Sequence, residues 1–482
     1  MLSLRAVLVL AILTAACGPS KGGGGDDDGG TGTPDAGPVC TPDETRACYD
    51  GPAGTEGVGP CTGGTQTCNS SGQWSACQGQ VVPSAEVCAN TIDDNCSGEV
   101  DEDVDLDADG YSSCAGDCCD STADGCTEPQ LVNPGAFEVD GNQLDDDCDG
   151  TADNALAACD DGLASNSSTA MDYARAIGLC QVATDGTWGV VSATLTRASG
   201  SGAPAAASRS IRPAFGGTAL REGMAMAVFS SGNAADANDT NPAYAAFQIG
   251  ADKGTTSAFP ADWLAANGGN LPSAPGCPDV LGNDAFDSVM LTLTIKAPSN
   301  ARSFSLNADF FSAEYPEWVC SPYNDFLVIL LDSTYAGDPP NPTDKNLATY
   351  TAPSNAVYPV GVNLAFGDTG LFRQCKNGPT GCTDEATDGN QTTCTGVTGL
   401  AGTGFDVANP PAPLLIEGWC GSSNLAGGGT GWLETRGNVV GGETITLRIA
   451  IWDTSDPIYD SLVLVDNFQW SVDAAEPGTV ID

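Results

Sequence analysis

Residues 86–153 read EVCANTIDDNCSGEVDEDVDLDADGYSSCAGDCCDSTADGCTEPQLVNPGAFEVDGNQLDDDCDGTAD, and the rest of the chain is organised around this stretch. It contains 21 Asp or Glu residues and no Lys or Arg. So many carboxylates without a basic partner repel one another in a compact chain. The stretch therefore either stays disordered or is neutralised by hard cations, which prefer oxygen ligands.

The spacing of the acids favours the cations. The string DLDADG at 105–110 matches the start of a calcium loop, with oxygen ligands at positions 1, 3 and 5 before a turn at Gly. Position 12 is Gly116 and not Glu, so we do not expect a helix-loop-helix EF-hand, and Asp117 or Asp120 would complete the ligand set. The acids also alternate, which in an extended chain places them on one side: Asp101, Asp103, Asp105, Asp107 and Asp109.

The stretch contains an internal repeat. The first copy has Glu86, Asn90, Ile92, Asp93, Asp94, Cys96, Gly98 and Asp101. The second copy has Glu138, Asn142, Leu144, Asp145, Asp146, Cys148, Gly150 and Asp153. A random acidic tail would not keep its acids, Cys and Gly in register.

These copies resemble the MopE-type metal-binding repeats of bacterial surface proteins and, more distantly, calcium-loaded thrombospondin type 3 repeats. The first copy keeps the pattern E-x-C followed by I-D-D-N-C-x-G-x-x-D-E, whereas the second has Asp140 where a Cys is expected. The resemblance implies a Cys88–Cys96 disulfide in the first copy and another partner for Cys148. The alternative is a solvated acidic spacer held by disulfides.

We therefore expect Ca²⁺ as the cofactor of residues 86–154, with carboxylate ligands throughout both copies and the loop between them. The expected ligands are Asp93, Asp94, Asp101, Asp103, Asp105, Asp107, Asp109, Asp117, Asp120, Asp145, Asp146, Asp147, Asp149 and Asp153.

The first 16 residues are expected to be a signal peptide, because Arg5 precedes an apolar run too short to span a membrane. The string LTAAC at 13–17 resembles a bacterial lipobox, although its Leu lies one place further from the Cys than usual. The resemblance implies a lipid anchor at Cys17, at the bacterial outer membrane or cell surface. Residues 17–39 would be the flexible tether. Secretion with cleavage after residue 16 is the alternative.

The cysteine count suits an exported protein with disulfides. Of 21 Cys, the 20 other than Cys17 form two even blocks: twelve from Cys40 to Cys148 and eight from Cys159 to Cys420. Residues 40–85 form a Cys-rich module with too few apolar residues for a core. The alternative, thiolate metal ligands, is disfavoured because the chain has no His.

The pattern of residues 155–475 predicts a mainly β fold, an antiparallel, jelly-roll-like β-sandwich, with residues 476–482 as a tail. A short helix within 167–179 is expected between Cys159 and Cys180, which we assign to disulfides. Alternating apolar residues predict strands at 190–197, 287–296, 303–311, 326–331, 444–452 and 461–472.

Four strings make residues 156–473 resemble the bacterial choice-of-anchor L domain. They are FFSAEYPEW at 310–318, YNDF at 323–326, IWDTSD at 451–456 and YDSLVLVDNF at 459–468, together with SSG at 230–232. That family is defined by one surface domain joined to varied sorting anchors. The resemblance therefore implies a location more than a chemistry.

The same strings contain oxygen ligands near strand ends, and we expect a second calcium site at Glu314, Asn324, Asp325 and Asp466. The alternative is that these side chains close turns through local hydrogen bonds. The aromatic residues among them suit either a core or a sugar-stacking platform: Tyr315, Trp318, Trp452 and Tyr459.

Composition excludes several functions. The absence of His removes His-dependent catalytic triads and His-ligated zinc. A net charge of −47 opposes binding to nucleic acid and to anionic membrane surfaces. Paired carboxylates, Glu314 with Glu317 or Asp453 with Asp456, leave glycoside hydrolysis open as the least favoured function.

We therefore expect a surface-anchored, calcium-stabilised, non-enzymatic lipoprotein that displays its β-sandwich for adhesion or matrix contact. A glycan-binding module is the alternative. The expected partners are the membrane, through the lipid anchor, and a surface glycan or protein ligand, with no nucleic acid.

Overall fold

The computed structural model describes residues 40–84, 86–101, 104–154, 156–184, 186–367, 369–381, 385–406 and 427–482. The expected signal peptide and tether, Cys17 and Asp103 lie outside these residues. The chain divides into two compact units, Met1–Glu102 and Asp103–Asp482. The division falls inside the region expected to be one acidic domain, so each copy of the repeat belongs to a different unit.

The first unit is held by disulfides rather than by a large core. In its described part, a hairpin pairs β1 (Thr45–Cys48) with β2 (Gly64–Thr67). The guanidinium of Arg46 lies 4.3 Å from the ring centre of Trp74 and covers it. Three disulfides have both partners in this unit: Cys40–Cys68, Cys48–Cys77 and Cys61–Cys96.

The expected Cys88–Cys96 disulfide is wrong, because Cys96 pairs with Cys61. Gly59 explains this pairing: a Cβ atom on it would come within 2.8 Å of the Asp93 carbonyl oxygen, so only Gly permits this approach. The approach joins the first copy to the Cys-rich module. Cys88 and Cys114 are also disulfide-bonded.

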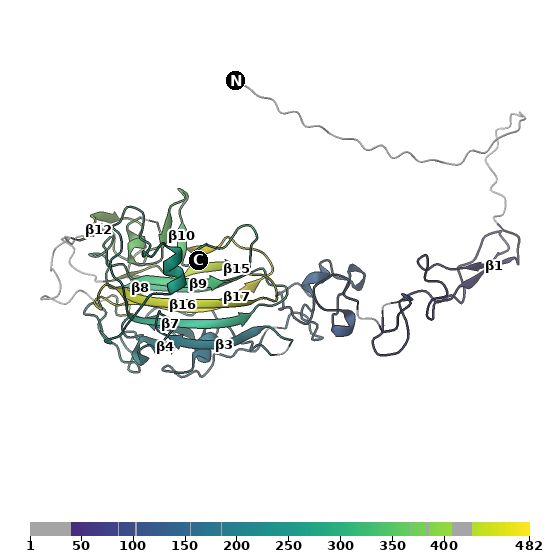
Figure 1. Ribbon diagram of the computed structural model, residues 1–482, viewed down its shortest axis with the longest axis horizontal. Coiled ribbons are helices and arrows are strands. Elements are labelled where there is room, and N and C mark those ends of the chain that lie inside the picture. The colour runs from purple at the N-terminus through teal and green to yellow at the C-terminus, as the bar shows by residue number, and fades with distance from the viewer. Residues whose placement is uncertain are drawn as a thin grey trace, which may run out of the picture. The chain divides into compact units, whose positions relative to one another are not determined.

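The second unit contains two large antiparallel sheets, and we call residues 156–482 the β domain (Figure 1). The seven-stranded sheet has the order β18-β15-β8-β17-β5-β4, with β14 paired to β8. Its strands are β4 (Arg209–Arg212), β5 (Met226–Ser230), β8 (Ser303–Ser312), β14 (Gly428–Gly429), β15 (Leu433–Asn438), β17 (Ser461–Ser471) and β18 (Gly478–Ile481).

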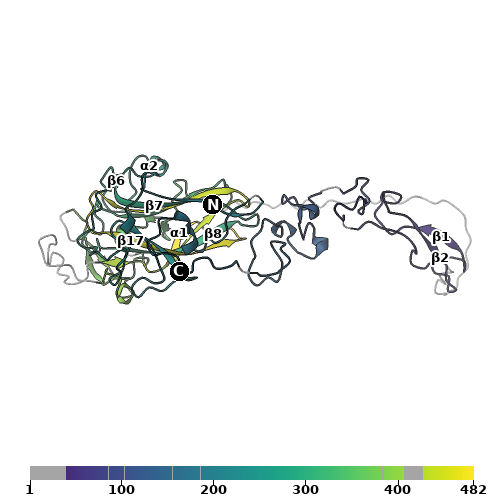
Figure 2. The same cartoon turned by 90° about the horizontal axis from the view of Figure 1, so that it is seen from below.

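The five-stranded sheet has the order β3-β7-β16-β9, with β6 paired to β7. Its strands are β3 (Gly189–Thr196), β6 (Thr256–Ser257), β7 (Ala285–Lys296), β9 (Phe326–Asp332) and β16 (Thr444–Thr454). Two short hairpins are β10 (Thr349–Thr351) with β11 (Val357–Pro359), and β12 (Gly378–Thr380) with β13 (Gly389–Gln391). The helices α1 (Ala170–Ala176) and α2 (Ala261–Ala266) are short (Figure 2).

Side chains from both large sheets form one hydrophobic core. Leu291 and Ile449 of the five-stranded sheet and Phe310 and Val463 of the seven-stranded sheet belong to it and are fully buried. Alternate residues of a strand point to the same face, which is why the period-2 pattern found these strands. The mainly β, antiparallel fold is confirmed, and the jelly-roll connectivity stays a prediction.

The expected tail at 476–482 is wrong, because β18 forms an edge of the seven-stranded sheet by pairing with β15. Its short sequence contains Gly478 and little alternation, so the pattern did not reveal it. Neither helix of the described chain combines the length and apolar character that a membrane crossing needs.

The residues just before the second copy are fastened to the β domain. The Asn300 carboxamide accepts the Phe137 N–H at 3.0 Å and donates to the Phe137 carbonyl at 2.9 Å. The Trp188 indole donates to the Ala136 carbonyl at 2.8 Å. Phe137 itself packs against the main core. The second copy therefore has a folded support within its own unit.

Candidate metal centre

Residues 104–154, which we call the acidic region, form loops and three short 3-10 helices: Ser113–Ala115, Thr122–Asp124 and Pro129–Leu131. The disulfides Cys118–Cys148 and Cys119–Cys126 tie these loops together. With so little regular backbone pairing, side-chain oxygens satisfy many of the backbone N–H groups.

The loop at 105–110 turns as the calcium-loop pattern predicts. One Asp105 oxygen accepts the Ala108 N–H at 2.6 Å and the other accepts the Gly110 N–H at 2.9 Å. Gly110 has φ +99°, a conformation that other residues rarely adopt. Asp120 joins this loop from further along the chain, because it accepts the Leu106 N–H at 2.6 Å.

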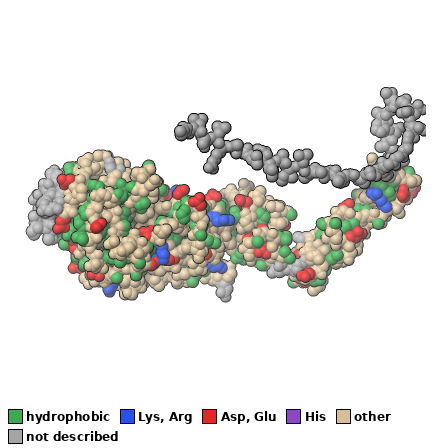
Figure 3. All heavy atoms as spheres, turned by 45° about the horizontal axis from the view of Figure 1, so that its top comes forward, with side chains coloured by type: hydrophobic (Ala, Val, Ile, Leu, Met, Phe, Trp, Pro, Cys, Tyr) green, Lys and Arg blue, Asp and Glu red, His purple; other side chains and the backbone are tan. Residues whose placement is uncertain are grey.

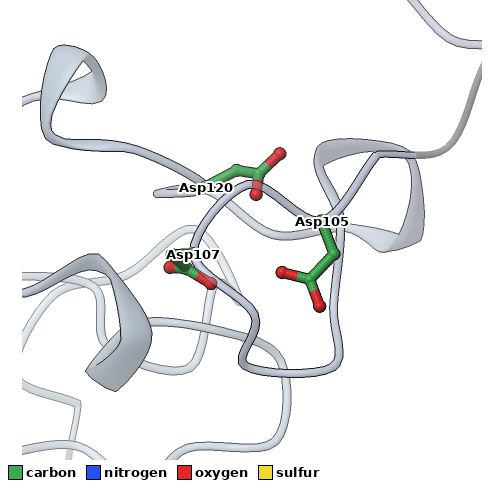
Figure 4. Close-up of side chains that lie close together, drawn as sticks. All are labelled: Asp105, Asp107 and Asp120. Carbon is green, nitrogen blue, oxygen red and sulfur yellow. The ribbon is translucent and has the colours of Figure 1, made fainter.

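Five aspartates of this loop form two groups that share one member. Asp105, Asp107 and Asp120 each offer an oxygen, and these oxygens lie within 4.8 Å of one another (Figure 4). Asp107, Asp109 and Asp117 form the second group by the same measure. Oxygens this close to one another can contact a single ion, so each group could hold a metal ion.

Two of these carboxylates have a buried oxygen without a hydrogen-bond partner: Oδ2 of Asp107 and Oδ2 of Asp117. Asp117 is only 6% exposed. Burial, together with repulsion from the neighbouring Asp109 and Asp107, raises the pKa of Asp117 to about 6. Burial also raises the pKa of Asp107. Buried carboxylates that face one another without donors need a proton or a cation.

The second copy contains a third group, in which Glu138, Asp145 and Asp147 bring their oxygens within 4.8 Å of one another. Oε2 of Glu138 is also buried without a partner. Burial raises the pKa of Glu138 and of Asp147. Glu138 is absent from the ligands expected from sequence, although the matching Glu86 of the first copy marks its position as part of the repeat.

Both copies fold their backbones alike. Asp93 accepts the N–H groups of residues 97 and 98 at 2.9 and 3.0 Å, and Asp145 accepts those of residues 149 and 150 at 3.0 and 2.9 Å. Asn90 donates to Asp94 at 2.6 Å, and Asn142 donates to Asp146 at 2.9 Å. These four aspartates therefore shape the loops in the same way.

The other expected ligands in the copies also hold the backbone. Asp101 accepts the N–H of residue 90, Asp153 that of residue 143, and Asp149 that of residue 151. Of the described residues, the structure thus groups Asp105, Asp107, Asp109, Asp117, Asp120, Asp145 and Asp147. It does not place Asp93, Asp94, Asp101, Asp146, Asp149 or Asp153 in such a group.

The second expected calcium site is only partly assembled. Glu314, Asn324 and Asp325 lie at adjacent strand ends and are buried. Asp466 lies inside β17, where it accepts the backbone N–H groups of Arg221 and Glu222 at 2.7 and 3.3 Å. Asp466 is therefore not part of that set, because the strand carries it away from the sheet end.

The aromatic candidates separate into two sets. Tyr315 and Trp452 are buried, as a core role requires. Trp318 and Tyr459 are partly exposed, and their ring centres lie 6.3 Å apart, while Tyr323 stands edge-on to Trp318 at 5.3 Å.

Comparison with known proteins supports the metal assignment of the repeats. The MopE family model, whose description is "putative metal-binding motif", matches residues 83–102 and 129–154. No curated protein and no solved structure matches the chain. The chain therefore carries a MopE-type metal-binding motif in both copies of its repeat, with the loop at 105–120 between the two matches.

Proposed function

We propose that the acidic region binds Ca²⁺ and that the ion completes its fold. The observation that carries this proposal is the set of buried oxygens without partners, one each on Asp107, Asp117 and Glu138, in the three carboxylate groups. A cation among them would neutralise the repulsion and provide a partner for these oxygens. Because metal binds only the folded loops, its binding energy would add to their stability.

The chemistry of the ligands supports Ca²⁺ over copper, the metal in the name of the matching family. Copper favours imidazole and sulfur ligands, whereas Ca²⁺ favours carboxylate oxygens. The chain has no His, and every described Cys is in a disulfide. The groups contain carboxylates alone.

We further propose that the protein is a non-enzymatic lipoprotein of the bacterial outer membrane or cell surface. The lipid would be attached at Cys17, with the membrane as the partner that it reaches. The β domain, a jelly-roll-like β-sandwich in this proposal, would be displayed for adhesion or matrix contact. The disulfides of both units support export. Lys and Arg are sparse on the face in Figure 3, which disfavours anionic partners.

Calcium binding to the full chain tests the proposal. Asp107→Asn alters two carboxylate groups at once, so we expect it to release bound Ca²⁺ in equilibrium dialysis. Asp124→Asn is the matched control, because Asp124 is exposed and belongs to no group. Equal calcium content in the wild type and Asp107→Asn, or stronger retention of copper than of calcium, would contradict the assignment.

A glycan ligand is the second candidate, and the partly exposed rings of Trp318, Tyr323 and Tyr459 favour it. Aromatic faces supply apolar contact area at binding sites that combine rings with polar groups. Glycan-array binding that Trp318→Ala abolishes would support this candidate over a protein ligand.

A further inference from the structure

One end of the β domain contains carboxyl groups that the acidic region does not explain. Glu314 follows β8, Asp325 precedes β9, and Asp453 lies next to the last residue of β16. Glu314 is 4% exposed, and Asp325 and Asp453 are each 1% exposed. An ionised carboxylate at such depth is costly unless donors or a cation compensate it.

The register of the five-stranded sheet brings two of the acids together. β16 pairs with β9 so that Trp452 lies opposite Phe326, and this register continues to Asp453 beside Asp325. On its other side, β16 has a register shift against β7 between Ile451 and Asp453. Such bulges redirect side chains and recur next to functional sites.

The seven-stranded sheet supplies the third acid. β8 ends at Ser312, which pairs with Ser461 at the start of β17, and Glu314 follows two residues later. The Ser461 hydroxyl donates to Asp325 at 2.6 Å, and the Asp325 N–H donates to Glu314. The three carboxyl groups thus lie where the ends of the two sheets meet.

Asp325 accepts hydrogen bonds on both oxygens, but Glu314 and Asp453 have few of the donors that a buried carboxylate needs. Oε2 of Glu314 has no hydrogen-bond partner. The carboxyl of Asp453 lies beside the Asp325 carboxyl, which is another acid, and beside the Ser231 hydroxyl. The same Ser231 hydroxyl also lies within hydrogen-bond distance of the Ser461 carbonyl, at 3.2 Å. None of the three acids is in an ion pair with a described base, and the ammonium of nearby Lys253 donates to Asn233.

The pKa values of these acids also indicate that their negative charge is poorly compensated. Burial raises the pKa of Glu314 and of Asp453 well above the usual range, and Asp325 adds repulsion to both. Burial also raises the pKa of Asp325 to about 8. Asp456, beside Glu314 and Asp325, adds a further negative charge.

We propose that Glu314, Asp325 and Asp453 form a divalent-cation site for Ca²⁺ between the ends of the two sheets. Their oxygens are not among the groups that lie within 4.8 Å of one another. The ion would therefore draw the carboxylates inward or bind one of them through water, as Ca²⁺ sites permit. Asp453 takes the place that the sequence assigned to Asp466.

Terbium luminescence tests this site separately from the acidic region. Tb³⁺ replaces Ca²⁺ at oxygen sites, and Trp452, the neighbour of Asp453, would sensitise its emission. The starting protein is the full chain with Asp107→Asn and Glu138→Gln, which disables the groups of the acidic region. We expect Asp453→Asn and Glu314→Gln each to raise the half-saturating Tb³⁺ concentration at least about tenfold, because the number of ligand charges sets the affinity for the ion.

Asp309→Asn is the matched control. Asp309 is a buried acid of the same domain, with Thr430 and Arg373 as its neighbours instead of this trio. The Asp309→Asn variant should keep the Trp-sensitised Tb³⁺ emission. Excess Ca²⁺ should reduce that emission by displacing Tb³⁺ from the site. If Asp453→Asn does not fold by circular dichroism, Glu314→Gln decides the question.

Emission that survives both trio substitutions would overturn the site. So would absence of emission combined with a higher melting temperature in Asp453→Asn, because that result would mean that no cation compensates these acids in the folded protein. If the acidic region binds no calcium but the trio still binds Tb³⁺, only the function proposed above is contradicted.

Discussion

The first and second copies of the repeat, residues 86–101 and 138–153, have nearly the same backbone, but their side chains differ at eight of sixteen positions. Cys96 and Cys148 have φ of 58° and 57°, and Asp101 and Asp153 have φ of 53° and 55°. Residue 95 is Asn where residue 147 is Asp, and residue 97 is Ser where residue 149 is Asp. Hydrogen bonds from the backbone to the shared aspartates therefore determine the conformation of the loop. Residues 95 and 97, and their counterparts 147 and 149, determine how much negative charge each copy offers to a metal.

The copies also differ in their support. Ile92 of the first copy is 45% exposed, whereas the matching Leu144 packs against Cys119, Cys126 and Val132. Asn300 fastens the residues before the second copy to the β domain. The second copy thus combines a carboxylate group with a rigid platform, as a preorganised binding site requires.

The largest expected effect comes from removing the Asn300 clamp, the two hydrogen bonds between the Asn300 carboxamide and the Phe137 backbone. Without this clamp, the second copy should lose the support that distinguishes it from the first. Asn300→Ala leaves the part-buried N–H and carbonyl of Phe137 without this partner, which should lower the opening free energy of the second copy by about 1–3 kcal/mol. Hydrogen exchange of amides 137–153 measures this loss. Asn270→Ala, at an exposed Asn, is the control, and unchanged exchange in Asn300→Ala would show that the clamp does not support the copy.

Substitutions at residues 95 and 147, where the copies differ, should change the Ca²⁺ affinity of each copy. Asp147→Asn gives the second copy the chemistry of the first, and we expect about tenfold weaker Ca²⁺ binding there, or about 1.4 kcal/mol. Asn95→Asp should strengthen the first copy in return. Calorimetric titration of the full chain measures both, with exposed Asp140→Asn as control. Equal affinities in all variants would refute the role of position 147.

The free energy of unfolding of the β domain should depend on pH. This dependence bears on the comparison of the two copies, because the second copy is fastened to that domain. Burial raises the pKa of Asp309 to about 8, so this acid keeps its proton when folded and loses it when unfolded near neutral pH. Its stabilising effect is full below about pH 4 and is lost as pH rises to about 8, by roughly 1 kcal/mol per unit.

Asp309→Asn should remove the share of the pH slope that this acid contributes and leave the shares of other buried acids, such as Asp325. Urea unfolding of the full chain between pH 5 and 8, followed by fluorescence, measures it. An identical pH slope in the variant would mean that Asp309 does not hold its proton in the folded state.

Local signals in the sequence predicted much of the fold and part of the site. The β7 and β16 strands follow from alternating apolar residues, and Asp105, Asp107 and Asp109 follow from their spacing before Gly110, because both signals act within a few residues. The Cys61–Cys96 pairing depends on the approach of Gly59 to Asp93, which no spacing reveals.

Strand register explains the remaining error. Asp453 and Asp466 both stand in motif-like strings, yet only the pairing of β16 with β9 brings Asp453 next to Asp325. Register between strands more than 100 residues apart is set by the packing of whole sheets, so it was not available from the sequence pattern.

The Cys118–Cys148 disulfide has a mechanical consequence. A pull on the chain would pass from Cys118 through the sulfur bond to Cys148, bypassing the residues between them. With a sequence separation of 30, the bond shields about 100 Å of contour length from extension. Under tension, the Glu138–Asp145–Asp147 group and the Phe137 contact would therefore carry no load along the backbone, and an ion held there would remain bound while the neighbouring chain is stretched.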